Sequence, residues 1–180
     1  MLTLGVIADT HIPDRLKTLP PQIFDIFHGV TAILHAGDVS APRVLAELAQ
    51  IAPVYAVAGN RDIGLGLPLD RVLEFDGVTI GLTHGHGGWG SYIAEKFAYL
   101  ARGYQKERFI QIARSRFDGA GVRAIVFGHT HRPVNEWRDG VLMFNPGSFG
   151  PDYYSPNNGP AVGLLRIDRS TLMAGIVCLD

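Results

Sequence analysis

Cysteine is almost absent from this chain, which has only Cys178, close to its end. A single thiol cannot form an internal disulfide, and zinc sites built from thiolates need several, so both frameworks are excluded while the redox compartment stays open. Long hydrophobic runs are also absent, since none reaches the roughly 18 residues that span a bilayer. No basic segment precedes the first apolar residues, so we expect no signal peptide, no membrane partner and a cytoplasmic location.

A large excess of charge of either sign is missing as well. The formal net charge is -1, which argues against capture of nucleic acid by the surface as a whole. Hydrophobic residues make up 47% of the chain and charged residues 18%, a composition typical of a globular protein rather than a disordered one. A chain of 180 residues can bury a substantial core, and we expect one domain that covers residues 1–180.

Apolar runs of strand length alternate with helical patterns in the first half of the chain, and paired strands dominate the second half. The first predicted strands are Leu2–Ala8, Ala32–Ala36 and Val54–Ala58, and the first predicted helix is Pro21–Phe27. We expect Ser40 to cap the second helix. Hairpins are predicted at Asp76-Gly77, Asp139-Gly140 and Arg169-Ser170, and a long helical region from Ser91 to Phe117. This order predicts an α/β fold with two packed β-sheets flanked by helices.

Polar side chains of metal-binding types follow five of the predicted strands. They are Asp9 and His11, Asp38, Asn60 and Asp62, His84 and His86, and His129 and His131. Five of the seven histidines belong to this set, which scatter would rarely produce. Each residue could singly be a turn, cap or exposed loop residue, but the carboxyl ends of strands in α/β sheets are where ligands bind. The set therefore predicts a metal site, and its mixture of imidazoles and carboxylates favours transition metals over Mg²⁺ or Ca²⁺.

The order of these motifs resembles a known family. The motifs are Asp9-x-His11, Gly37-Asp38, Gly59-Asn60, His84 and Gly128-His129-x-His131. Together they are similar to the signature of the calcineurin-like metallophosphoesterases. The short chain, His84-Gly85-His86 and Asn145-Pro146-Gly147-Ser148 resemble the small microbial phosphodiesterase (YfcE-like) branch. The resemblance implies the family's four-layer metallophosphoesterase sandwich and hydrolysis of a phosphoester, with a phosphodiester favoured.

The same resemblance implies a role for each candidate ligand. One metal would be held by Asp9, His11 and His131, a second by Asn60, His84 and His129, and Asp38 would bridge the two. The cofactors would be two divalent transition-metal ions, with Mn²⁺ favoured and Fe, Co²⁺, Ni²⁺ or Zn²⁺ as alternatives. A hydroxide bridging paired metals can attack phosphorus in line, so no covalent enzyme intermediate is needed.

One position departs from the wider family pattern. Many superfamily members carry histidine after the Gly-Asn pair, as the proposed leaving-group acid, whereas this chain has Arg61, which cannot donate a proton at neutral pH. Our hypothesis is that Arg61 contributes charge to phosphate binding and that leaving-group protonation is weak or falls to His86. We therefore expect esters with good leaving groups to be hydrolysed best. The alternative is an ion pair of Arg61 with Asp62 or another acid.

The segment from Gly88 to Arg123 is locally basic, with seven lysines and arginines against three acids, and rich in aromatic residues. Such a surface could contact nucleic acid, although we favour packing of an apolar helix face that includes Phe109 and Phe117. A dimer contact or a lid is a third option. The expected partners are thus a small phosphodiester substrate and, through residues 88–123, a second copy of the chain, with nucleic acid less favoured.

Two other functions remain open. The chain also resembles the retromer subunit that shares this fold and binds partner proteins, a likeness that Ile12-Pro13 after the first motif strengthens. A catalytically weak scaffold is therefore one alternative, and a phosphomonoesterase or nuclease is another. The complete set of candidate ligands favours an enzyme, because a pure scaffold has no chemical need for them.

Overall fold

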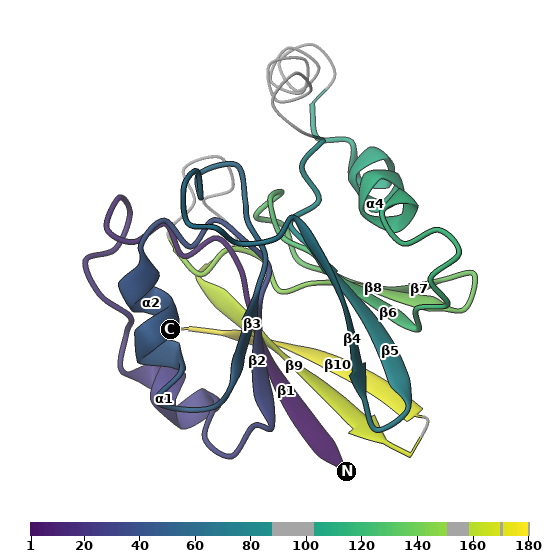
Figure 1. The fold of residues 1–180 in the computed structure, drawn as a ribbon, viewed down its shortest axis with the longest axis horizontal. Helices are drawn as coiled ribbons and strands as arrows, with labels where there is room; N and C mark the ends of the chain where they lie inside the picture. The colour runs from purple at the N-terminus through teal and green to yellow at the C-terminus, as the bar shows by residue number, and fades with distance from the viewer. Residues whose placement is uncertain (88–102, 151–158, 170, 180) are drawn as a thin grey trace.

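Two five-stranded β-sheets stacked face to face dominate the computed structural model, which describes residues 1–87, 103–150, 159–169 and 171–179 (Figure 1). The first sheet, in the order β10-β9-β1-β2-β3, contains β1 (Leu2–Ile7), β2 (Ala32–His35), β3 (Val54–Ala56), β9 (Ala161–Asp168) and β10 (Thr171–Cys178). The second, in the order β4-β5-β6-β8-β7, contains β4 (Asp70–Phe75), β5 (Val78–Thr83), β6 (Ala124–Val126), β7 (Val134–Arg138) and β8 (Val141–Asn145). The described helices are α1 (Gln22–Ile26), α2 (Pro42–Leu48) and α4 (Lys106–Ser115).

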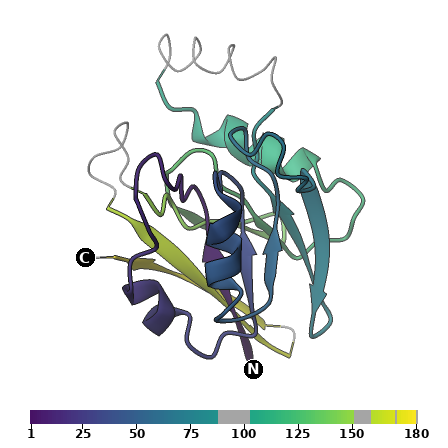
Figure 2. The same ribbon diagram turned by 60° about the vertical axis from the view of Figure 1, so that its left-hand side comes forward.

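Three apolar clusters separate four layers. Between the two sheets, Leu34 of β2 and Ile80 of β5 belong to one buried cluster. On the outer face of the first sheet, Ile23 of α1 and Leu48 of α2 are buried in a second cluster, and both helices lie along that sheet (Figures 1 and 2). On the outer face of the second sheet, α4 buries Ile110 in a third. The predicted α/β sandwich with helices on both outer faces is confirmed.

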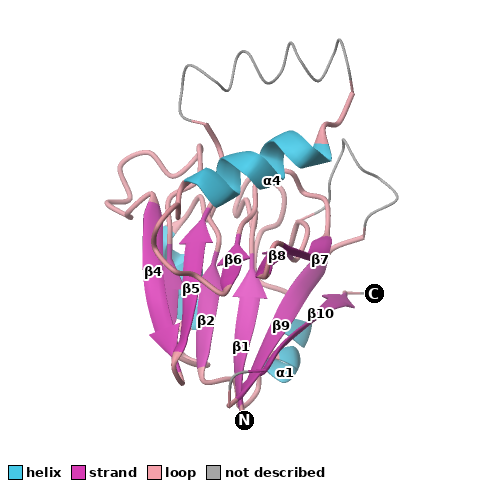
Figure 3. Cartoon of the chain, turned by 90° about the vertical axis from the view of Figure 1, so that its right-hand side faces the viewer, coloured by secondary structure: helices cyan, strands magenta, loops and turns pink. Residues whose placement is uncertain are grey.

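The central strands are parallel, and this places their carboxyl ends along one edge. Strand β1 pairs in parallel with β2, and β2 with β3. In the second sheet, β5, β6 and β8 are parallel to one another. The arrowheads of β1, β5 and β6 point the same way in Figure 3, so the loops that follow these strands gather at one end of the molecule. Because Val6 faces the second sheet and Ile7 faces the helices, β1 is apolar throughout, as a strand covered on both faces must be.

The hairpin predictions agree with the backbone. Left-handed φ angles of 50° at Asp76 and 74° at Gly77, and of 47° at Asp139 and 79° at Gly140, fit the two-residue turns that match strand twist. Strands β9 and β10 also pair antiparallel, although Ser170 lies outside the described residues. Residues 91–102 of the predicted long helical region also lie outside the described residues, and α4 (Lys106–Ser115) is its described helix. No described helix is long and apolar enough to cross a membrane.

The predicted helix cap at Ser40 is wrong. Helix α2 begins at Pro42 after Ala41, and its N-terminus receives no side-chain hydrogen bond. The hydroxyl of Ser40 is buried without a hydrogen-bond partner among the described residues. The carboxylate of Asp62 holds this turn instead, because it accepts the backbone N–H groups of Val39 (3.1 Å) and Ser40 (2.8 Å). Asp38, another candidate cap, makes no such bond either.

Candidate metal centre

The seven candidate ligands follow five strand ends and lie at the same edge of the sandwich. Asp9 and His11 follow β1, Asp38 follows β2, Asn60 follows β3, His84 follows β5, and His129 and His131 follow β6. Parallel pairing within each sheet and packing of the sheets bring these loops together. The contacts divide the seven side chains into two groups that share one carboxylate.

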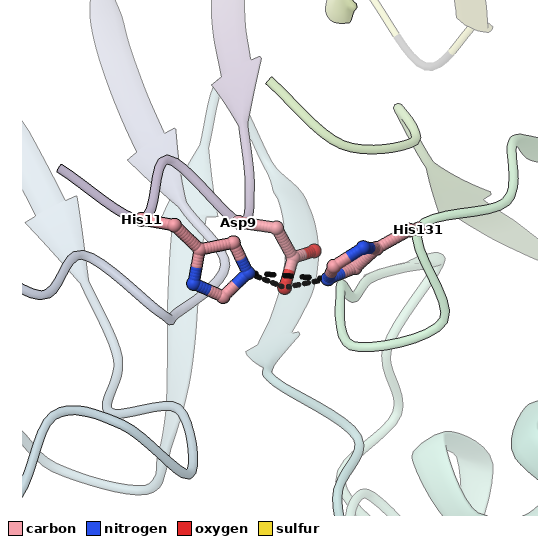
Figure 4. Close-up of side chains that lie close together, drawn as sticks. All are labelled: Asp9, His11 and His131. Atoms are coloured by element: carbon pink, nitrogen blue, oxygen red, sulfur yellow. Dashed lines mark hydrogen bonds and ion pairs between the residues drawn. The ribbon is translucent and has the colours of Figure 1, made fainter. Parts of the chain in front are cut away.

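The first group consists of Asp9, His11 and His131 (Figure 4). The Nε2 atoms of His11 and His131 lie 3.2 Å apart. The Asp9 Oδ1 atom lies 3.3 Å from Nε2 of His131 and 3.8 Å from Nε2 of His11. Asp9 and His11 are fully buried, and His131 is nearly so. Three potential ligand atoms from strand ends more than a hundred residues apart thus converge on one point.

The second group consists of Asn60, His84 and His129. The Oδ1 atom of Asn60 lies 3.2 Å from Nε2 of His84 and 3.1 Å from Nδ1 of His129. Asp38 lies between the two groups, with Oδ2 3.7 Å from Nε2 of His11 and Oδ1 3.7 Å from Nε2 of His84. One carboxylate therefore offers an oxygen to each group. Asp9, Asp38 and His84 also bring ligand atoms within reach of one ion.

The backbone at these positions is unusual. Five of the seven candidate ligands have positive φ angles without being glycine: Asp9 (55°), His11 (49°), Asp38 (53°), His129 (68°) and His131 (55°). This left-handed conformation costs free energy for L-residues and persists only where surrounding contacts impose it. Two such contacts join neighbouring strand ends, from Asp9 N–H to the Gly37 carbonyl (3.0 Å) and from His11 N–H to the Asp38 carbonyl (3.1 Å).

The arrangement of lone pairs fits a bound cation. The Nδ1–H of His84 donates to the Ala36 carbonyl at 2.7 Å, so the Nε2 of the neutral ring carries a lone pair. Burial lowers the pKa of His84 to about 4, which keeps the ring neutral at pH 7. Its Nε2 lone pair faces the Asn60 Oδ1, which is also an acceptor. In the first group, the buried Asp9 Oδ1 has no hydrogen-bond donor among the described residues. A cation would satisfy both places.

Burial and mutual repulsion set the protonation of the two carboxylates. Burial, reinforced by the negative charge of Asp9, raises the pKa of Asp38 to about 7. Burial would raise the pKa of Asp9 as well, but the imidazoles of His131, His84 and His11 hold it below its usual range. Burial lowers the pKa of His11 to about 3. Without metal, Asp38 is thus about half protonated near pH 7.

This protonation predicts how metal affinity depends on pH. Asp38 must lose its proton to bind a cation, so we expect the affinity of the metal-stripped protein for Mn²⁺ to rise about tenfold per unit below pH 7 and to level off above it. His11 and His84 are already neutral there and add no slope. Calorimetric titrations at about pH 6, 7 and 8 measure this. A flat affinity across that range, or an unchanged slope in Asp38→Asn, would contradict it.

Several residues that position the site were not singled out for this role from the sequence. Asp62, grouped there with Asn60, instead accepts three backbone N–H groups, including that of Gly59 at 2.8 Å. Asn145 donates to the Gly128 carbonyl (2.9 Å), next to His129. The Ser148 hydroxyl lies 3.3 Å from the Asp9 carbonyl. The Asn-Pro-Gly-Ser motif after β8 was the available signal for the last two residues, because it ends a strand at the same edge.

The two candidate catalytic residues lie beside the groups, but their contacts differ from those proposed. The guanidinium of Arg61 lies 3.0 Å from the Asp14 carboxylate, and both side chains are about half exposed. The alternative ion pair is therefore present, with Asp14 rather than Asp62. The Arg61 backbone N–H donates to Asp38 Oδ1 at 2.9 Å. His86 packs its ring 5.3 Å from that of His84, and burial lowers its pKa to about 4. His86 is thus neutral at pH 7, which weakens it as a proton donor.

Helix α4 and the residues just before it contribute an aromatic column as well as a buried face. The ring of Phe109 meets that of His129 edge-on at 5.7 Å, and Tyr104 stacks on Phe109 at 5.9 Å. The guanidinium of Arg132 lies 4.5 Å from the Tyr104 ring centre. Phe109, expected within the apolar packing face, is only half-buried, and its ring lies against that of the candidate ligand His129. Such contact restrains the orientation of the His129 ring.

Comparisons of sequence and of structure find known proteins that are similar to this chain. The calcineurin-like phosphoesterase superfamily domain matches residues 2–170. A probable metallophosphoesterase from Methanothermobacter thermautotrophicus is 35% identical over 98% of this chain and 92% of its own length. Phosphodiesterase MJ0936 from Methanocaldococcus jannaschii is 26% identical over 81% of this chain and 83% of its own.

The fold is also that of solved structures. A crystal structure of Vps29 from Entamoeba histolytica complexed with Zn²⁺ aligns with a TM-score of 0.72 and 25% identity over 98% of both chains. Its similarity extends through both sheets, since it covers almost all of each molecule. From the match over residues 2–170 and the 35% identity to a metallophosphoesterase, the chain belongs to the calcineurin-like phosphoesterase superfamily.

Proposed function

We propose that this chain hydrolyses a phosphodiester with the help of two divalent transition-metal ions. The observation that carries the proposal is the position of Asp38, whose two carboxylate oxygens face different groups of candidate ligands at 3.7 Å each. A single-ion site would not need a buried carboxylate between two sets of imidazoles. The relative named phosphodiesterase, 26% identical over 83% of its length, supports a diester as substrate.

The proposed ligand roles follow the two groups. Asp9, His11 and His131 would hold one ion, Asn60, His84 and His129 the other, and Asp38 would contact both. When bound, such ions supply Lewis acidity and an activated water for in-line displacement at phosphorus. Mixed nitrogen and oxygen ligands suit Mn²⁺, our favoured metal, as well as Fe, Co²⁺, Ni²⁺ and Zn²⁺.

The remaining side chains would bind and orient rather than attack. Thr10 is the hydroxyl residue between Asp9 and His11, but its Oγ1 is buried and donates to the Val39 carbonyl at 3.1 Å. It is thus a poor nucleophile, and a covalent intermediate is not part of the proposal. Arg61 would contribute positive charge at the rim, because an ion pair between exposed side chains holds it only weakly to Asp14.

A catalytically weak scaffold is the second candidate function, and the likeness to Vps29 favours it. The Vps29 structure from Entamoeba histolytica holds Zn²⁺, so binding of a metal does not by itself separate an enzyme from a scaffold in this fold. Turnover does. The distinguishing measurement must therefore follow product formation and metal content together.

Metal removal tests the proposal directly. The metal-stripped protein is expected to lose hydrolysis of an aryl phosphodiester almost completely and to regain it with about two equivalents of Mn²⁺. Because neutral His86 and Arg61 are poor proton donors, an alkyl diester should react at least about a hundredfold more slowly than the aryl one. Product release and bound Mn²⁺ are measured on the same samples.

Each outcome of this experiment is decisive. Two bound ions without turnover would support the scaffold and sink the enzyme. Faster hydrolysis of an aryl monoester than of the aryl diester would identify a phosphomonoesterase instead of a phosphodiesterase. Cleavage of single-stranded DNA would identify a nuclease. Equal rates on aryl and alkyl diesters would show that a leaving-group acid exists after all.

A further inference from the structure

Phe109 of α4 lies against a candidate metal ligand instead of the apolar cluster beneath the helix. That cluster contains Ile110, Ala113 and Phe117, and Phe109 is not among the described residues that form it or pack against it. The side chain of Phe109 is half-buried, and its ring meets the ring of His129 edge-on at 5.7 Å. Helix α4 lies across the end of the sandwich where the strand loops gather (Figure 3). A partly exposed aromatic ring is thus placed beside the candidate metal centre.

The second group of candidate ligands is accessible at the member that Phe109 contacts. Within this group His84 is buried, whereas Asn60 and His129 are half-exposed. Solvent therefore reaches the group beside His129, where the Phe109 ring lies. An ester that approaches on this side comes next to an aromatic surface before it meets the ligands.

Tyr104 and Arg132 extend this surface, and we call them together with Phe109 the aromatic patch. The ring of Tyr104 stacks on that of Phe109, with 5.9 Å between the ring centres and 14° between the ring planes. The guanidinium of Arg132 lies 4.5 Å from the Tyr104 ring centre, and the Tyr104 hydroxyl contacts the side chain of Thr130. These contacts hold the patch against the loop that carries His129. Aromatic rings and guanidinium groups both stack on planar π systems.

We infer that the aromatic patch binds a planar aromatic substituent of the phosphoester whose phosphoryl group lies at the metal centre. An aromatic partner gains more from contact with Phe109 than an alkyl group does, because ring pairs attract beyond the area that they bury. The inference rests on the proposed function and deepens it by naming the substrate class, an aryl or nucleoside ester. The alternative is that Phe109 only restrains the His129 ring, an effect that would be the same for every anion bound at the metals.

The test compares phenylphosphonate with methylphosphonate, which carry the same anionic group and differ in the ring. Neither is an ester, so neither is hydrolysed while calorimetry measures its binding to Mn²⁺-loaded protein. We expect wild type to bind phenylphosphonate about fivefold or more tightly than methylphosphonate, and Phe109→Leu to reduce this preference to about twofold or less. Phe109→Tyr keeps the ring and should keep the preference. Phe24→Leu is the matched control, because Phe24 is a helical phenylalanine of α1 that is 40% exposed on the outer face of the other sheet.

A second pair of ligands separates the two kinds of aromatic ester. Thymidine 5′-monophosphate and 2-deoxyribose 5-phosphate differ in the presence of the base. If Phe109→Leu also abolishes a preference for the nucleotide in this pair, the patch takes a nucleoside ester. If the effect is confined to the phosphonates, the patch takes an aryl ester. Both results support the inference.

The ratio of the two phosphonate affinities decides against the inference as clearly as for it. Equal weakening of both phosphonates in Phe109→Leu would show that the ring only restrains His129. An equal loss of preference in Phe24→Leu, or in Phe109→Tyr, would also overturn the inference. Binding of both phosphonates by wild type without a ring preference would sink the inference alone, whereas binding of neither would sink the proposed function with it.

Discussion

Asp38→Asn is expected to reduce hydrolysis of an aryl phosphodiester by on the order of a thousandfold while the fold stays intact. The asparagine amide keeps an oxygen that can accept the Arg61 N–H, a bond of 2.9 Å in the structure. It lacks the negative charge and the second oxygen that Asp38 offers to the two groups. The measurement is the kcat and KM of both proteins with Mn²⁺, after circular dichroism has shown equal folding. An undiminished variant would refute the enzyme proposal.

The same substitution has an opposite effect on the metal-free protein. Folding raises the pKa of Asp38 from 3.8 to about 7, so the folded state binds its proton more tightly than the unfolded one. The contribution of Asp38 to stability therefore falls as pH rises from about 4 to 7, and above pH 7 its ionised form destabilises the fold by at most about 4 kcal/mol. Asparagine removes this cost. Asp38→Asn should thus unfold at higher urea concentration than metal-stripped wild type at about pH 8, with a smaller gain at about pH 5.

A destabilised variant at pH 8 would contradict this account, because it would mean that the carboxylate is stabilised by contacts other than a metal. The combination is diagnostic. Substitution of a residue that only supports the fold lowers the stability of the protein. Substitution of a metal-binding carboxylate held among buried groups lowers activity and raises the stability of the metal-free protein. Few structural roles predict both signs at once.

Gly59→Ala is expected to destroy the metal centre and to lower the free energy of unfolding by about 3 kcal/mol or more. Gly59 precedes Asn60, and a Cβ built on it overlaps both the backbone nitrogen and the carboxylate of Asp38. The loop after β2 cannot simply withdraw, because the Asp38 carbonyl accepts the His11 N–H at 3.1 Å. Urea unfolding and Mn²⁺ titration of the variant measure the two losses.

Gly175→Ala is the matched control for this prediction. Gly175 lies exposed in β10, and a Cβ there meets nothing within 4 Å. We expect it to change stability by about 0.5 kcal/mol or less and metal affinity not at all. If Gly59→Ala behaved like Gly175→Ala, the approach of the β2 and β3 loops would not be needed for the site. The prediction of loss depends on that approach, not on glycine as such.

The amino-acid sequence by itself determined the layered fold and the seven candidate ligands. Strand ends can be read locally, because an apolar run stops where a polar residue such as Asp9 or Asp38 begins. In a sheet with parallel central strands, these ends must lie along one edge. The hairpin turns at Asp76-Gly77 and Asp139-Gly140 could also be predicted locally. An Asp-Gly pair readily adopts the two adjacent left-handed φ angles that such a turn requires.

Tertiary structure alone decided which side chains face one another. Asp62 was grouped with Asn60 among residues of metal-binding types, yet its carboxylate accepts backbone N–H groups from a loop more than twenty residues away. Arg61 pairs with Asp14, and Arg15 contacts His131 across the two sheets. These contacts arise where loops from separate strands pack together, and the hydrophobic periodicity of the sequence does not predict them. The sequence could therefore name the candidate ligands, but only the folded chain shows which side chains contact them.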